Sequence, residues 1–97
     1  MDESDKLGAG MMRIGKYCRD DEECFNNQTR LLGIYTFNRI VAKCAGRKVD
    51  DEIFKPGNIN QARNVMGLIP SMTRVAINPD IMQCVIDEFE EYEEHFG

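Results

Sequence analysis

One helical pattern of apolar residues constrains the fold of this chain more than any other feature. Between residues 20 and 45, apolar side chains recur at spacings of three and four: Leu31, Ile34, Tyr35, Phe37, Val41, Cys44 and Ala45. Such spacing places them on one face of an α-helix. Asp20 or Asp21 can cap its start, and Gly46 suits a left-handed stop at its end. The pattern predicts a long helix over about 20–45 with this face buried.

A second long helix is predicted over about 78–96. Asn78 is a good cap residue, and Pro79 fits the first helical position because its missing N–H costs nothing there. The predicted buried stripe of this helix comprises Ile81, Val85, Phe89, Tyr92 and Phe96.

Shorter elements are expected between and before these helices. A single turn is predicted over 50–54, and a helix from Asn58 or Asn60 to about Gly67, with Ala62, Val65 and Met66 facing inward. An extended link is predicted over 74–77. Residues 1–8 are polar and aperiodic, so they are predicted to form a flexible tail. The expected architecture is all-α: a compact bundle of four or five helices forming one domain over 9–97.

Composition narrows the class of protein. The chain is 42% hydrophobic and 30% charged, which is typical of a globular domain. No apolar run approaches the ~20 residues that span a bilayer. No charged-then-apolar leader opens the sequence, so a cytoplasmic protein that does not contact a membrane is expected.

The expected location also predicts the oxidation state of the four cysteines. A cytosolic chain keeps its thiols reduced, and Cys44 and Cys84 lie on predicted apolar faces, where a thiol packs as a small hydrophobe. Buried, reduced cysteines are therefore predicted. Zinc ligation and two disulfides remain the alternatives, although five residues separate Cys18 from Cys24, against two to four in most zinc sites.

Charge is strongly segregated along the chain, whose formal net charge is −5. Residues 80–97 contain seven acidic side chains and no Lys or Arg, whereas residues 24–79 contain eight basic and three acidic ones. The acidic helix is a solvated face, a face that pairs with the basic middle segment of the chain, or a surface for a partner with a basic surface. The candidate partner-binding residues are Asp87, Glu90, Glu91, Tyr92, Glu93, Glu94 and Phe96.

A basic stripe offers an alternative site. Arg39, Lys43 and Arg47 are spaced by four on the first long helix, and Lys48 follows. These residues could hold a nucleotide or another phosphate ligand. Direct nucleic-acid binding is not expected, because it normally needs a basic domain to release counterions. Homodimerisation is compatible with a domain of this size.

The sequence contains few candidate catalytic residues. His95 is the only histidine, and the two serines lack the glycine pattern of a nucleophile elbow. Acidic pairs at Asp20/Glu23 and Glu90/Glu93 leave a metal-dependent all-α nucleotide hydrolase as a further alternative. The expected protein is not an enzyme and has no catalytic residue, cofactor or bound metal.

Two short patches resemble the small acidic helical anti-sigma proteins of T-even-type phages. They are Gly46-Arg47-Lys48 followed by Phe54, and Ile86-Asp87-Glu88-Phe89 within the acidic C-terminal helix. Length, acidity and helical character are similar as well. The resemblance implies a small acidic protein that binds and blocks a larger one, as an anti-sigma or anti-defence inhibitor does. A nucleic-acid-handling machine with a basic groove is the expected type of target.

Overall fold

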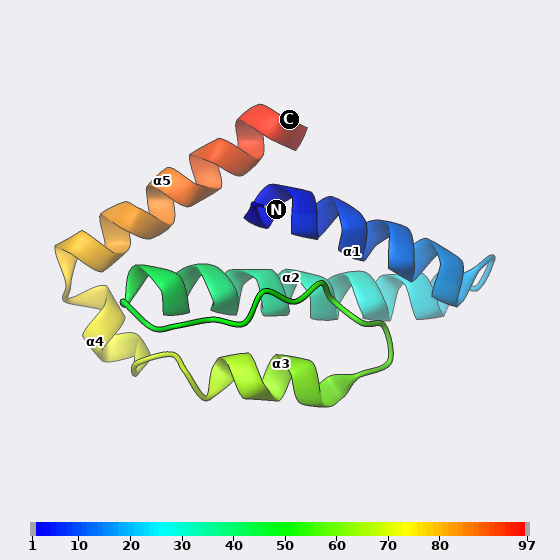
Figure 1. Cartoon of the computed structure of the whole chain (residues 1–97), viewed down its shortest axis with the longest axis horizontal. Helices are drawn as coiled ribbons and strands as arrows, with labels where there is room; N and C mark the ends of the chain where they lie inside the picture. Colours follow the sequence, from blue (N-terminus) through cyan, green and yellow to red (C-terminus); the bar gives the residue numbers. More distant parts are fainter. Residues whose placement is uncertain (1, 97) are drawn as a thin grey trace.

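The computed structural model describes the backbone of residues 2–96 and the side chains of residues 2–94. Within this range the protein is all-helical, with five helices in chain order (Figure 1). They are α1 (Glu3–Cys18), α2 (Glu22–Cys44), α3 (Ile59–Met66), α4 (Met72–Ala76) and α5 (Pro79–Phe96). The predicted bundle and its two long helices, α2 and α5, are confirmed.

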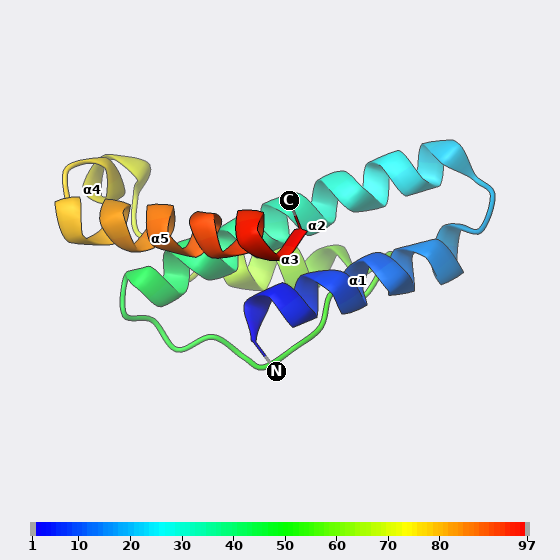
Figure 2. The ribbon, with the colours of Figure 1, turned by 90° about the horizontal axis from the view of Figure 1, so that it is seen from above.

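The longest helix, α2, lies at the centre of the fold. α1 precedes it, is joined to it by a tight turn and packs antiparallel to it (Figures 1 and 2). α3 lies on another side of α2, and α5 runs back along the C-terminal half of α2. This course brings the end of α5 close to the start of α1, although the two are far apart in sequence. A loop over 45–58 follows α2 and leads to α3.

Several helix starts follow local sequence signals. The Asp21 side chain accepts a hydrogen bond from the N–H of Cys24 at 3.0 Å, and Asn58 caps α3 in the same manner. Asn78 Oδ1 accepts from the N–H groups of Asp80 and Ile81 at 3.0 and 3.3 Å. Each bond satisfies an N–H that has no partner within its own helix. Gly46, with φ +77°, adopts the left-handed conformation expected after α2.

Two apolar clusters form the core. One joins α1, α2, the 45–58 loop and α3, and it comprises Ile14, Cys18, Leu32, Tyr35, Phe54 and Val65. The other joins α2, α4 and α5, and it comprises Ile40, Val41, Val75, Ile81 and Val85.

The central position of α2 overturns part of its predicted buried face. Ile34 and Phe37 were expected inside, but they are 45% and 36% exposed. Leu32, Ile40 and Ala42 are buried instead. Because neighbours cover α2 from several sides, its buried positions do not form one stripe.

The flexible tail predicted over 1–8 is wrong. Residues 3–8 belong to α1, whose start is capped by the Asp2 side chain. Glu3 and Lys6 are 8% exposed, because both form ion pairs that hold this end of the chain in place. The first residues of α1 are mostly polar, so they lack the apolar periodicity that predicts a helix.

Two short elements also differ from expectation. Residues 50–54 form no helical turn, because the 45–58 loop runs extended to bring Phe54 into the core. Residues 74–76, expected to be extended, lie in α4, which begins after Ser71 accepts a hydrogen bond from the N–H of Arg74. In α3, Ala62 and Val65 are buried as predicted, but Met66 is 54% exposed.

The prediction of reduced cysteines is also wrong. Cys18 is bonded to Cys24, and Cys44 is bonded to Cys84. The first disulfide closes the turn between α1 and α2, and the second ties the end of α2 to the start of α5. The thiols pair because the fold brings together positions that the sequence separates by up to 40 residues.

Candidate functional site

The acidic side chains of α5 form no ion pair among the side chains that the structure describes. Asp87, Glu90, Glu91, Glu93 and Glu94 are exposed, and Glu88 is half-buried. Among the described side chains, the ion pairs involve the acids Glu3 and Asp51 and none of the acids of α5. Residues 87–94 of α5 therefore form a negatively charged surface that has no ion pair within the described part of the chain.

Two of the predicted partner-binding residues are aromatic. Tyr92 is half-buried and packs against the apolar cluster of α2, α4 and α5. Burial raises the pKa of its hydroxyl above the ordinary value, with the charge of Glu3 acting in the same direction. The Phe96 side chain lies outside the described residues, as does the imidazole of His95.

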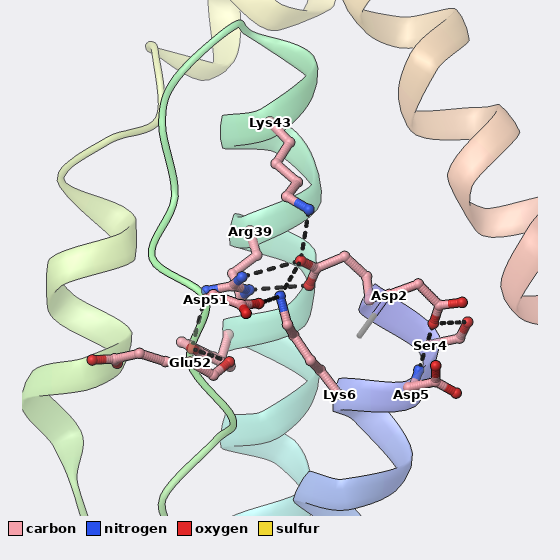
Figure 3. A network of polar contacts seen from close by, with 10 residues as sticks. Asp2, Ser4, Asp5, Lys6, Arg39, Lys43, Asp51 and Glu52 are labelled. Carbon is pink, nitrogen blue, oxygen red and sulfur yellow. Dashed lines mark hydrogen bonds and ion pairs between the residues drawn. The ribbon is translucent and has the colours of Figure 1, made fainter.

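The four cations of the basic stripe, considered as an alternative site, have different surroundings in the structure. Arg39 is only 2% exposed, and its guanidinium is hydrogen-bonded to the Glu3 carboxylate (Figure 3). Lys43 Nζ lies 2.8 Å from Glu3 Oε1. Arg47 and Lys48 follow the end of α2 and are exposed. Two of the four cations are thus already occupied by a carboxylate of α1.

Glu3 is the centre of a polar network between α1, α2 and the 45–58 loop. Lys6 reaches both Glu3 and Asp51, and Arg39 Nη1 donates to the Tyr35 hydroxyl at 3.3 Å (Figure 3). Burial alone would raise the pKa of Glu3, but hydrogen bonds from Arg39 and Lys43 lower it to about 2. The charges of this network thus pair with one another and join α1, α2 and the loop.

Beside the acidic surface lies an apolar groove between α2 and α5. It has a volume of about 600 Å³, and it is lined by Leu7, Gly33, Thr36, Phe37, Phe89, Tyr92 and Glu93. The rings of Phe37 and Phe89 are stacked with centroids 6.0 Å apart. Both rings remain more than a third exposed, so they form an apolar surface that contacts water.

The sequence assigned Phe37 and Phe89 to the core and did not identify the groove. A signal for it was present, because α5 carries a second apolar stripe, Met82, Ile86 and Phe89, beside the buried one. An amphipathic helix with one buried face needs only one such stripe. The second stripe is 39–45% exposed.

No set of metal ligands converges in the part of the chain that the structure describes. Asp20 and Glu23 lie at the turn between α1 and α2, whereas Glu90 and Glu93 lie in the C-terminal half of α5, near the other end of α1 (Figure 2). The two acidic pairs considered for a hydrolase therefore do not face each other. Within the described residues, no helix combines the length and apolarity needed to cross a membrane.

Comparisons with protein-family models, curated proteins and solved structures give no match to this chain. The residues and geometry described above therefore carry the functional argument.

Proposed function

We propose that this protein is a small helical interaction protein that binds and blocks a larger protein with a basic surface. The binding surface is the C-terminal half of α5 together with the adjoining groove. One observation carries the proposal: the acids of α5 have no ion-pair partner among the described residues, although Arg39 and Lys43 lie on the neighbouring helix and pair with Glu3 instead.

The acids and the groove have complementary roles in this proposal. Exposed like charges speed the approach of an oppositely charged partner and select against acidic ones. Apolar and aromatic contacts that lose water supply most of the affinity. Phe37 and Phe89 provide such contacts immediately beside the negative charge.

The disulfides indicate the type of compartment in which the protein binds its partner. Such bonds persist in oxidising compartments and are rare in the cytosol. We therefore propose that the oxidised chain acts outside a reducing cytosol, in contrast to the cytoplasmic location expected from the sequence. A cytosolic nucleic-acid-handling target would require a chain with reduced cysteines. Thiol alkylation of protein from its native source, with and without reductant, distinguishes the two.

Affinity capture from the native source tests the proposal. The bait is the full disulfide-bonded chain, and the test variant changes Glu90, Glu91, Glu93 and Glu94 to Gln. A matched control changes four exposed acids elsewhere, Asp20, Glu22, Glu23 and Asp50, to their amides, so that both variants lose the same charge.

We expect one partner to be retained by the wild type and the control, and lost by the α5 variant. High salt should weaken its capture, because exposed charge pairs are screened. If both variants retain the partner, or both lose it, the position of the acids on α5 does not matter. Either result would contradict the proposal.

A further inference from the structure

The groove between α2 and α5 has the geometry of a docking site for a helix. Its lining comes from α2 and α5 together with Leu7 of α1, and a further helix can pack into such a groove by inserting its side chains between theirs. We infer that its occupant is a basic amphipathic helix of the protein partner; this inference rests on the proposed function.

The apolar stripe of α5 leads directly into the groove. Met82, Ile86 and Phe89 are spaced by four and three, so they form one line along the helix. Phe89 stacks on Phe37 of α2, and the adjacent Tyr92 ring lies 6.5 Å from that of Phe89. An incoming helix with apolar residues at i, i+3, i+4 and i+7 matches this line.

Gly33 leaves the opposite wall open. A Cβ at this position would meet no atom within 4 Å, so the surface of α2 has space beside Phe37. A bulky apolar side chain of the partner helix can enter there and approach the backbone of α2 closely.

The same line becomes acidic at its C-terminal end. Glu90 lies one turn beyond Ile86, and Glu93 lies one turn beyond Phe89 and lines the groove. Both carboxylates are exposed and free of ion pairs within the described residues. Lysine or arginine at the corresponding end of the partner helix would pair with them. This charge pattern selects a basic helix over an acidic one.

Two other occupants fit less well. An extended segment would leave its N–H and C=O groups unpaired against phenyl rings, because no strand edge borders the groove in residues 2–96. A second copy of the chain would add its own seven acids from residues 80–97 to a surface that is already negative.

Binding of three synthetic peptides to the full disulfide-bonded chain tests the inference. Each peptide has ~18 residues, or about five helical turns. The first has a leucine stripe and lysines elsewhere, the second replaces the lysines by glutamates, and the third is the first with a central proline that breaks the helix. Affinity is measured by calorimetry, and helix content by circular dichroism.

We expect the lysine peptide alone to bind, and to gain helix content as it does so. Phe89→Ala should weaken its binding about tenfold or more, as loss of a central aromatic anchor does. Glu90→Gln with Glu93→Gln should weaken binding and flatten its salt dependence. The control Ile77→Ala removes a 75% exposed apolar side chain outside the groove, and it should leave binding unchanged.

Equal binding of the proline peptide, or no effect of Phe89→Ala, would overturn the inference. A dimer detected by sedimentation that Phe89→Ala dissociates would overturn it in favour of a second copy. The capture experiment separates the two levels of the argument. If the natural partner is lost by the glutamine variant of α5 but retained by Phe89→Ala, partner binding by the acids of α5 stands, and the role of the groove and of a helix in it is wrong.

Discussion

The guanidinium of Arg39 and the carboxylate of Glu3 form a two-pronged ion pair across 36 residues of sequence. Arg39 Nε donates to Glu3 Oε2 and Arg39 Nη2 donates to Glu3 Oε1, both at 3.0 Å. Both side chains are almost fully buried. The pair fixes the start of α1 against α2, close to the groove that Leu7 helps to line.

Removing one member of this pair should strongly destabilise the fold. Glu3→Gln leaves the Arg39 charge buried without its carboxylate, and such changes cost about 3 kcal/mol or more. Urea unfolding measures the loss. The control Asp50→Asn removes an exposed carboxylate and should change the free energy of unfolding by less than about 0.5 kcal/mol.

A double-mutant cycle shows whether the two residues act as a unit. Arg39→Met combined with Glu3→Gln should cost less than the sum of the single changes, because no buried charge remains unpaired at either position. Strict additivity would mean that the pair contributes nothing by its contact.

The pH dependence of stability should carry the imprint of Glu3. Hydrogen bonds from Arg39 and Lys43 outweigh the effect of burial and lower its pKa from 4.5 to about 2. Because the folded pKa lies below the unfolded one, Glu3 stabilises the fold fully above about pH 4.5, and this contribution is lost as the pH falls to about 2. Arg39 keeps its charge throughout this range, because its pKa lies far above it.

Urea unfolding of the wild type and of Glu3→Gln between pH 6 and pH 2 checks this expectation. The difference in free energy between the two proteins should shrink as acid protonates Glu3. A difference that stays constant down to pH 2 would contradict the assigned role.

The sequence predicted what local rules control. Caps at Asp21, Asn58 and Asn78 and the three-to-four spacing of apolar residues located α2, α3 and α5 to within a few residues. These signals operate over one or two helical turns, so they are readable without knowledge of the fold.

What the sequence concealed depends on contacts between distant segments. Glu3 appeared to belong to a polar tail because its partner Arg39 lies on another helix. Arg39 in turn appeared to be a cation for a phosphate ligand or for the acidic C-terminal helix, and not a partner of Glu3. Phe37 and Phe89 each fitted a buried stripe, and only their stacking across α2 and α5 shows that they line a groove. The composition of residues 80–97 predicts that the end of α5 is acidic. Only the structure shows that these acids form no ion pairs within the described residues.

The two disulfides should contribute unequally to stability. Cys44 and Cys84 are 40 residues apart, whereas Cys18 and Cys24 are separated by 6. Closing the longer loop removes more entropy from the unfolded chain, about 4 kcal/mol against about 2 kcal/mol. Replacing each pair by alanine and measuring urea unfolding tests the order. A larger loss from the Cys18–Cys24 pair would show that local geometry outweighs loop closure.

Two glycines of α1 provide a matched test of the helix that replaces the expected tail. A Cβ at Gly8 would meet no atom within 4 Å, so Gly8→Ala should stabilise the protein by about 1 kcal/mol through its better helix propensity. A Cβ at Gly10 would lie 3.0 Å from Leu32 Cδ1 and 3.3 Å from Phe54 Cβ, in the packed core. Gly10→Ala should therefore lower stability by up to about 2 kcal/mol, because an overpacking cost of about 1–3 kcal/mol exceeds the same gain in helix propensity.

Urea unfolding of the two variants beside the wild type distinguishes α1 from a mobile segment. In a mobile tail over 1–8, Gly8→Ala would not change the free energy of unfolding, since Gly8 would not be helical when folded. Opposite signs at positions two residues apart require a helix whose Gly10 side faces Leu32 and whose Gly8 side is open. The same packing of α1 places Leu7 in the lining of the groove. If the two substitutions did not have opposite effects, α1 would not pack in this way, and the groove would lack the contribution of Leu7.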